Sequence, residues 1–302
     1  MKLLVVCGAT ATGKSQLAIA LAHHFDGEIV NADSMQIYRG MDIGTAKLSP
    51  EEREGVAHHL LDVLEVNQDS TVAWFQSAAR AAITDIHARG KSAIVVGGTG
   101  LYIKSILDEL NFPDTDPEVR KKLEKELEVI GLNALFERLE KLDPAAAIAI
   151  DRANARRVIR ALEVIEITGK PFTANLPREA STRYPDARQF GLVMDREKLD
   201  ERISARVERM GDEGFVAEVE TLLQRGLTDA RTAQLALGYS QIIAYLDGKM
   251  SQDEAREDTK RATRQYARRQ ETWFSRDERI TWISPVQPHL QSVLAHFEKL
   301  DS

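Results

Sequence analysis

The chain has 302 residues, 43% of them hydrophobic and 29% charged, a composition typical of a globular protein built as one large domain or as a core with a smaller insertion. A single cysteine excludes a disulfide framework and a thiolate metal cluster, and no segment approaches the roughly 20 apolar residues that span a bilayer, so we expect a cytoplasmic protein with no membrane partner. The formal net charge of −7 argues at first against a nucleic-acid partner, although a local basic surface binds phosphates even on an acidic protein.

A phosphate-binding loop follows the first predicted strand. The strand is an apolar run over residues 3–7, and the segment directly after it matches the pattern G-x-x-x-x-G-K-[ST] in full. That segment is Gly8, Ala9, Thr10, Ala11, Thr12, Gly13, Lys14 and Ser15. Its glycines let amide N–H groups surround an anion at the start of a helix, which we expect over 17–22. The Lys14 amine would reach the terminal phosphates and the Ser15 hydroxyl would hold Mg²⁺, so the sequence predicts a di- or triphosphate site.

Two further strands are expected to end beside this loop. Residues 28–31 form a short strand that ends near Asp33, and residues 92–96 form a buried strand that ends in two glycines. A helix over 72–89 lies between them, and this alternation is typical of a parallel sheet covered by helices on both faces. Ligands bind at the carboxyl ends of the strands in such sheets, so the phosphate loop, Asp33 and the segment 97–100 should line one crevice.

The strand over 92–96 is not followed by the acidic residue that is typical of ATPases and GTPases. ATPases and GTPases typically place an Asp at the end of such a strand to hold the magnesium shell, whereas this strand is followed by Gly97, Gly98 and Thr99. Asp33 is then the carboxylate best placed to face the crevice. It either removes a proton from an acceptor that attacks a diphosphate donor or merely caps the turn that follows it.

The sequence changes character at Pro113. Helical periodicity runs from Asp116 onward to a stop at Gly169, and a strand over 190–194 then returns to the sheet. After that strand only helices are expected, over 199–211, 215–225, 239–246 and 252–274. The predicted fold is α/β, a P-loop NTPase-like parallel sheet flanked by helices with a helical C-terminal part. Its core domain would comprise 1–115 and 188–302, with a helical insertion domain over 116–187.

Two predicted helices carry basic stripes. The first stripe is Arg152, Arg156, Arg157 and Arg160, and the second is Lys260, Arg261, Arg264, Arg268 and Arg269. On pattern alone each stripe is either a solvated helix face or a surface that neutralises RNA phosphates.

Several longer motifs carry a family resemblance. After the phosphate loop the chain continues with DSMQIY at 33–38, MDIGTAK at 41–47, HHLLD at 58–62, GGTGLY at 97–102, RALEV at 160–164, GYSQ at 238–241 and TRQYARRQETW at 263–273. In this order, from about Leu3 to Trp282, the sequence closely resembles the bacterial tRNA dimethylallyltransferases, also called tRNA isopentenyltransferases. The resemblance implies transfer of a dimethylallyl group from dimethylallyl diphosphate to the exocyclic amine of the adenosine just 3′ of the anticodon in tRNA.

The resemblance also implies roles for individual residues. The loop would hold the diphosphate of the donor in place of ATP, with Mg²⁺ as cofactor, and Asp33 would be the general base. Lys14, Thr10, Thr99 and Arg206 would act on the leaving group. The anticodon stem-loop of tRNA would contact Asp33, Ser34, Met35, Gln36, Thr99, Arg120, Arg156, Arg157, Arg160, Gly238, Tyr239, Ser240, Arg268, Arg269 and Gln270. Ser240 stands where the family often has an arginine, which implies a weaker phosphate contact.

Other readings remain open. A small-molecule or nucleotide kinase would also use the phosphate loop but leaves the basic stripes unexplained, and a prenyltransferase acting on free adenine nucleotides would need no RNA surface. A non-enzymatic RNA-binding module is disfavoured by the complete phosphate site. We expect a monomer, structural or positioning roles for His58 and His59, and core positions for Trp273 and Trp282.

Overall fold

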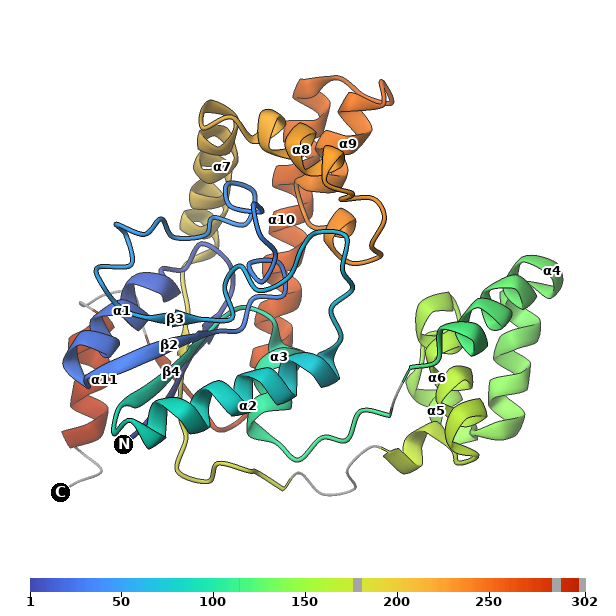
Figure 1. Cartoon of the computed structure of the whole chain (residues 1–302), viewed down its shortest axis with the longest axis horizontal. Helices are drawn as coiled ribbons and strands as arrows, with labels where there is room; N and C mark the ends of the chain where they lie inside the picture. Colours follow the sequence, from blue (N-terminus) through green and yellow to red (C-terminus); the bar gives the residue numbers. More distant parts are fainter. Residues whose placement is uncertain (114, 176–180, 284–288, 299–302) are drawn as a thin grey trace. The chain divides into compact units, whose positions relative to one another are not determined.

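The computed structural model describes residues 1–302 except 114, 176–180, 284–288 and 299–302 (Figure 1). The chain forms two compact units. Unit 1 comprises Met1–Leu107 and Tyr184–Ser302, and unit 2 comprises Asp108–Arg183. Unit 2 contains most of the stretch for which the sequence predicts a helical insertion. No helix in the described part of the chain is both long and apolar enough to cross a membrane.

A parallel sheet forms the centre of unit 1. Its strands among the described residues are β1 (Leu3–Gly8), β2 (Gly27–Asn31), β3 (His58–His59), β4 (Ser92–Val96), β5 (Arg188–Leu192) and β6 (Ile280–Ile283). They lie in the order β3-β2-β4-β1-β5-β6, and every neighbouring pair is parallel. Because helices cover both faces of a parallel sheet, its central strands are buried throughout, which explains the unbroken apolar run of β1. The predicted α/β fold is confirmed.

Helices pack on both faces of this sheet (Figure 1). The helices of unit 1 among the described residues are α1 (Lys14–His24), α2 (Val72–Ala88), α3 (Gly100–Leu107), α7 (Arg196–Asp212), α8 (Phe215–Gln224), η2 (Ala233–Leu235), α9 (Tyr239–Leu246), α10 (Gln252–Phe274) and α11 (His289–Glu298). Alternate residues of a strand face opposite sides, so Leu4 and Val6 pack against α1, whereas Val5 and Cys7 pack with residues of α2 and α3. The buried strands leave their carboxyl ends as the place where a ligand can be reached.

The expectation that only helices follow residue 194 is wrong. β6 adds a strand beside β5, and its four residues are too few for a sequence period to distinguish strand from loop. β3, of two residues, and α3, which starts at a glycine, were not expected for similar reasons. The core positions expected for Trp273 and Trp282 are also wrong, because both side chains are 40% exposed. The ring of each tryptophan lies close to a glycine, Trp273 to Gly100 and Trp282 to Gly191.

Unit 2 is a small helical bundle. It contains α4 (Pro117–Leu142), α5 (Pro144–Ala149), α6 (Ala155–Thr168) and η1 (Phe172–Asn175). Asp116 caps α4 by accepting from two backbone N–H groups of its first turn, and Gly169 ends α6 in a left-handed conformation. Within α4, Gly131 has non-helical dihedral angles that divide the helix into two arms. Leucines of both arms pack against α6 in one apolar cluster, so the predicted helices of the insertion are confirmed.

Candidate functional site

The phosphate loop turns sharply between β1 and α1. Gly8 has a φ of 132°, and a Cβ at this position would lie 2.7 Å from the carbonyl oxygen of Leu192, so only glycine fits. Gly13 takes a left-handed conformation just before α1. Thr12 is buried, and its hydroxyl donates to the Ala9 carbonyl at 2.8 Å, which braces the loop from inside. The sequence folds this segment into a rigid cradle at the N-terminus of a helix.

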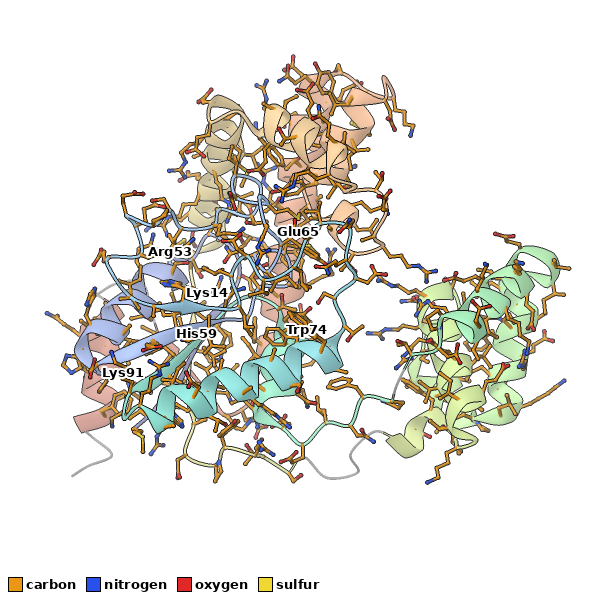
Figure 2. All side chains as sticks on the ribbon, viewed as in Figure 1. Lys14, Arg53, His59, Glu65, Trp74 and Lys91 are labelled. Carbon is orange, nitrogen blue, oxygen red and sulfur yellow. The ribbon has the colours of Figure 1, made fainter. Side chains whose placement is uncertain are left out.

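Lys14 is the first residue of α1 (Figure 2). Its Nζ donates to the Ala9 carbonyl at 2.6 Å. Burial lowers the pKa of Lys14 to about 8, while the nearby Asp33 carboxylate opposes this shift and Arg206 adds to it. The amine therefore sits in an environment that lacks a fully compensating anion, and a bound diphosphate would supply one.

Arginines of α7 complete the cationic surroundings of the loop. Arg206 donates from Nη1 to the Thr10 hydroxyl oxygen at 3.0 Å, and Arg202 donates to the Ala11 carbonyl at 3.2 Å. Burial lowers the pKa of Arg206, and the Asp33 carboxylate opposes that shift. Because Thr10 Oγ1 accepts a hydrogen bond from Arg206, the hydroxyl proton of Thr10 can be donated to a phosphate oxygen.

Gln270 joins the phosphate loop to the loop after β4. It is 5% exposed; its Oε1 accepts from the Thr10 N–H at 2.9 Å, and its Nε2 donates to the Gly98 carbonyl at 2.9 Å. A Cβ at Gly98 would overlap the Gln270 amide, so the glycine allows this close approach. One consequence is that the Thr10 N–H points at Gln270, which leaves anion binding to other amides of the loop.

Asp33 follows β2 and uses one carboxylate oxygen in the local turn. Its Oδ1 accepts from the Met35 N–H at 2.9 Å, and the side chain of Asn31 bonds both the N–H and the carbonyl of Asp33 at 3.1 Å. No described residue donates a hydrogen bond to Oδ2. Asp33 acts electrostatically on Lys14 and Arg206. One oxygen therefore caps the turn, as one of the two readings left open by the sequence expects, and the other oxygen has no hydrogen-bond donor among the described residues.

Thr99 belongs to the loop that follows β4 and lies beside the turn that contains Asp33. Its hydroxyl oxygen accepts from the Ser34 N–H at 3.2 Å and lies 3.4 Å from the Ser34 hydroxyl. Burial, together with the Asp33 charge, raises the pKa of Tyr266 of α10 to about 12, and the nearby Thr99 side chain opposes this shift. The structure thus brings Asp33, Lys14, Thr10, Thr99 and Arg206 together at the carboxyl ends of β1, β2 and β4.

Comparison with known proteins decides which family has this arrangement. Residues 36–277 match the protein family described as IPP transferase. The chain belongs to the IPP transferase family. It is 56% identical over 292 residues to the tRNA dimethylallyltransferase of Thermobifida fusca, covering 95% of this chain and 91% of the relative. It is 55% identical over 287 residues to the enzyme of the same name from Kineococcus radiotolerans, covering 93% and 90%. The chain is therefore an enzyme of the tRNA dimethylallyltransferase type.

Solved structures of the family have the same fold. The tRNA isopentenylpyrophosphate transferase of Bacillus halodurans superposes with a TM-score of 0.71 at 40% identity, covering 99% of this chain and 95% of that one. A eukaryotic dimethylallyltransferase described as acting on tRNA superposes with a TM-score of 0.78 at 29% identity, covering 94% of this chain and 73% of that one.

The arginines of the first basic stripe differ in whether they form ion pairs within the protein. Arg156 and Arg157 on α6 are exposed, and no carboxylate among the described residues pairs with either. Arg160 instead donates to Glu163 at 2.9 Å, and Arg120 reaches the same carboxylate at 3.4 Å. Glu163 is fully buried, so it holds these two arginines in place from beneath. Arg156 and Arg157 are the members of the stripe available to an external phosphate.

The basic residues of the second stripe, on α10, differ in the same respect. Lys260 and Arg261 pair with acidic residues of their own helix, and Arg264 donates to a serine hydroxyl of α7 at 2.7 Å. Arg268 and Arg269 are exposed, and within the described ranges neither forms an ion pair. The Arg269 guanidinium lies 5.7 Å from the ring centre of Tyr266.

Several of the expected tRNA contacts have side chains turned into the protein. Tyr239 is fully buried and donates to a glutamate of α8 at 2.6 Å. The Gly238 N–H and the Ser240 hydroxyl each lie 2.9 Å from the side-chain amide oxygen of Gln241. Gln270 is buried between the phosphate loop and the loop after β4. In this structure these groups contact other parts of the protein. They therefore support the surface expected to bind tRNA from beneath.

His58 and His59 have protein partners. His58 Nδ1 bonds the Val56 carbonyl at 2.8 Å, and His59 Nε2 bonds Glu28 at 2.7 Å. Both partners belong to the protein, which agrees with the structural or positioning roles expected for the two histidines.

Sequence reasoning missed Arg202, Tyr266 and Glu218. Arg202 precedes Arg206 by one helical turn, and this i,i+4 spacing is a signal that could have found it. Tyr266 lies in the motif at 263–273, but the motif alone does not show that its side chain comes near Asp33 and Thr99. Glu218 contacts a loop about 175 residues away in sequence, and no local pattern indicates this.

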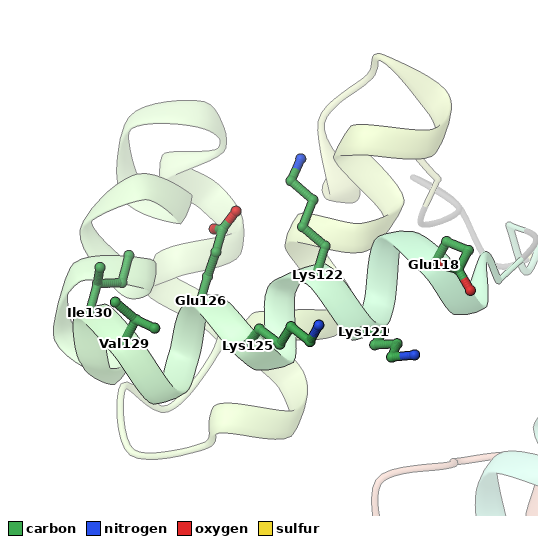
Figure 3. A pocket seen from close by; sticks show the side chains of 7 residues that line it. All are labelled: Glu118, Lys121, Lys122, Lys125, Glu126, Val129 and Ile130. Carbon is green, nitrogen blue, oxygen red and sulfur yellow. The ribbon is translucent and has the colours of Figure 1, made fainter.

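Two further observations concern metal and small-molecule sites elsewhere in the molecule. Among the described residues no group of three or more His, Cys, Asp and Glu side chains is arranged to hold a metal ion. A surface hollow along α4 is lined by Glu118, Lys121, Lys122, Lys125, Glu126, Val129 and Ile130 (Figure 3). Because its charges are mixed and its apolar residues lie at one end, it lacks the converging polar groups of a small-molecule site.

Proposed function

We propose that this chain transfers a dimethylallyl group from dimethylallyl diphosphate to the exocyclic amine of the adenosine 3′-adjacent to the anticodon in tRNA, with release of diphosphate. The observation that carries the proposal is a cationic phosphate loop beside the Asp33 carboxylate, at a sheet edge where β4 ends without an acidic residue. Relatives that cover most of the chain are named tRNA dimethylallyltransferases, which supports both the donor and the acceptor.

The donor half of the reaction needs charge stabilisation on the leaving diphosphate. Lys14 and Arg206 are cations that flank the loop, and the Thr10 hydroxyl has a proton to donate. As the bond between the allylic carbon and the diphosphate oxygen breaks, the electron pair stays with that oxygen. Fixed donors aimed at the oxygen stabilise the transition state more than the ground state, because negative charge on it grows during the step.

The acceptor half needs a base next to the incoming amine. The adenine amine nitrogen forms the new bond to the allylic carbon, and Asp33 accepts the proton that this nitrogen loses. Oδ2 is the oxygen for this role, because Oδ1 is engaged by the Met35 N–H. Thr99, through Ser34, holds the turn that carries Asp33, and this keeps the base in position.

Magnesium fits this site as an ion carried mainly by the diphosphate. Mg²⁺ is bound through few protein ligands together with substrate phosphates and waters, which agrees with an isolated hydroxyl at Ser15 in the first turn of α1. When bound, the ion would neutralise charge on the diphosphate oxygens. Ser15 would hold it, and the remaining chemistry falls to Lys14, Arg206 and Asp33.

RNA binding falls to the exposed arginines that form no ion pair within the described part of the chain. Arg156 and Arg157 of unit 2 and Arg268 and Arg269 of unit 1 are cations whose charge partner would be an RNA phosphate. The target base must leave its stacked position before its amine can react, and binding of the flanking phosphates offsets the cost of that step.

A direct test is incubation of the purified chain with labelled dimethylallyl diphosphate and unmodified tRNA, with AMP and ATP as parallel acceptors. The proposal predicts label in tRNA alone, at an initial rate that is at least about 100-fold lower after Asp33→Asn substitution. Label in AMP but not in tRNA would indicate a prenyltransferase for free nucleotides. Phosphate transfer from ATP to an acceptor would indicate a kinase.

A further inference from the structure

A carboxylate on α8 organises a loop outside the phosphate site. Glu218 accepts hydrogen bonds from three consecutive backbone N–H groups, those of Asp42 at 3.1 Å, Ile43 at 2.7 Å and Gly44 at 3.3 Å. It also accepts from the Tyr239 hydroxyl at 2.6 Å. Consecutive N–H groups that converge on one point form an anion-binding nest, and here the anion is part of the protein.

Aromatic packing fixes the same segment from the side. A Cβ at Gly44 would overlap the rings of both Phe215 and Tyr239, so the backbone lies directly against them. The two rings meet edge to face with centres 4.9 Å apart. Burial and the Glu218 charge raise the pKa of Tyr239, so its hydroxyl stays a donor to Glu218.

A buried cation closes the other end of this loop, which we define as the 41–47 loop. Lys47 has a side chain that is 2% exposed, and its Nζ donates to Asp42 at 2.6 Å, to Asp62 at 2.6 Å and to the Tyr38 carbonyl at 2.8 Å. With Glu218 at its start and Lys47 at its end, the 41–47 loop has little freedom to move.

The 41–47 loop in turn orients the side chain of Gln36. The Gln36 Nε2 donates to the Thr45 carbonyl at 3.1 Å, which fixes which end of the amide is the nitrogen. No described residue donates to Gln36 Oε1, so that oxygen is free to accept from a ligand. Gln36 lies three residues beyond Asp33, within the segment assigned to the RNA.

We propose that Glu218 is a positioning residue for RNA recognition. Through the 41–47 loop it holds the Gln36 amide so that Oε1 accepts an N–H group from the edge of a nucleobase beside the target adenosine. This inference rests on the proposed function. It adds a residue of unit 1 that touches neither the diphosphate nor the RNA and yet sets the affinity for the RNA.

The test is Glu218→Gln, which keeps the size of the side chain but turns an N–H group toward the backbone donors. The matched control is Glu220→Gln, an exposed residue of the same helix. Steady-state kinetics with an anticodon stem-loop RNA and dimethylallyl diphosphate should show the KM for RNA raised about 5- to 10-fold in Glu218→Gln, as expected when one hydrogen bond to the RNA is removed. The Kd for the donor should stay within about twofold, because the phosphate loop is untouched.

A double-mutant cycle with Gln36→Ala separates positioning from a general loss of stability. If Glu218 acts through Gln36, the double variant has a KM for RNA close to that of Gln36→Ala alone. Multiplied effects, or an unchanged KM in a folded Glu218→Gln protein, would overturn the proposal. If Glu218→Gln does not fold, Tyr239→Phe takes its place in the same cycle and is judged by the same outcomes. An inactive wild-type chain would instead count against the proposed function.

Discussion

Asp33 divides two tasks between its carboxylate oxygens. Oδ1 holds the turn through the Met35 N–H, and Oδ2 is left without a donor among the described residues. Replacement by asparagine preserves the turn, because the amide oxygen still accepts from Met35, but it removes the proton acceptor. The structure therefore allows the chemical role of Asp33 to be separated from its structural role.

We expect Asp33→Asn to lower kcat by about two to four orders of magnitude, the usual contribution of a general base. The melting temperature and the Kd for tRNA should change little, because the turn is retained. Single-turnover assays with saturating donor measure the chemical step. A variant with near-normal single-turnover rate would remove Asp33 from catalysis.

Lys14 gives a second prediction for a single side chain, on pH. Burial lowers its pKa to about 8, so the amine of the free protein loses its proton as the pH rises through that value. A bound diphosphate favours the ammonium form and raises this pKa. Binding near pH 8 should therefore take up a proton, and affinity should fall at higher pH. Calorimetry in buffers of different ionisation enthalpy measures the uptake, with Lys14→Met as control. Equal uptake by both proteins would contradict the assignment.

Among the helices, α10 carries both two arginines that we propose bind RNA and a glutamine that bonds the phosphate loop. Arg268 and Arg269 are exposed on it, while Gln270 at the next position is buried and bonds both Thr10 and Gly98. Sequence periodicity identified the helix and its basic stripe but did not distinguish external from internal partners. Ion pairing to Glu208, Glu257 and Asp258 makes that distinction, and the pairing to Glu208 depends on the tertiary arrangement.

Replacing Arg268 and Arg269 by alanine, or Arg156 and Arg157, should weaken tRNA binding. The slope of log affinity against log salt should fall by roughly one unit for each RNA phosphate that is no longer neutralised. Arg261→Ala is the matched control, because Arg261 pairs with Asp258 and lies on the same helix. Saturating turnover should change less than kcat/KM. Equal salt slopes for the wild type and both double variants would show that the RNA surface lies elsewhere.

For the chain as a whole, prediction from sequence succeeded where the pattern is local. The loop at Gly8 to Ser15 could be predicted because a strand, a glycine-rich turn and a helix follow one another directly. β6 could not be predicted, because four residues at a sheet edge carry little periodicity and are held by pairing with β5. Glu218 could not be predicted either, because its role depends on packing between segments far apart in sequence.

The central sheet offers a prediction on the stability of unit 1. Glu28 of β2 is 5% exposed and accepts from Arg89 at 2.8 Å and from His59 at 2.7 Å. The hydrogen bonds from Arg89 lower the pKa of Glu28 to about 2. A carboxylate with a lowered pKa stabilises the folded state above its unfolded pKa, and this contribution is lost as the pH falls toward 2.

Glu28→Gln should therefore lower the free energy of unfolding at pH 7 by about 2 kcal/mol, since it breaks the ion pair between a buried carboxylate and the exposed Arg89. The difference from the wild type should shrink between about pH 4.5 and pH 2, where the wild-type carboxylate gains a proton. Urea unfolding at a series of pH values measures both quantities. A difference that is independent of pH would mean that packing, not charge, is what the substitution removes.

The proposed reaction depends on a phosphate loop that presents a prenyl diphosphate to an RNA adenosine beside Asp33. The most direct test is to incubate tRNA with the chain and dimethylallyl diphosphate, digest the tRNA with a nuclease, and identify the modified fragment by mass spectrometry. We expect one added C5H8 unit on the adenosine 3′-adjacent to the anticodon, with one diphosphate released for each modified tRNA. An unmodified anticodon loop, or a C5H8 unit on a different nucleotide, would refute the proposed reaction.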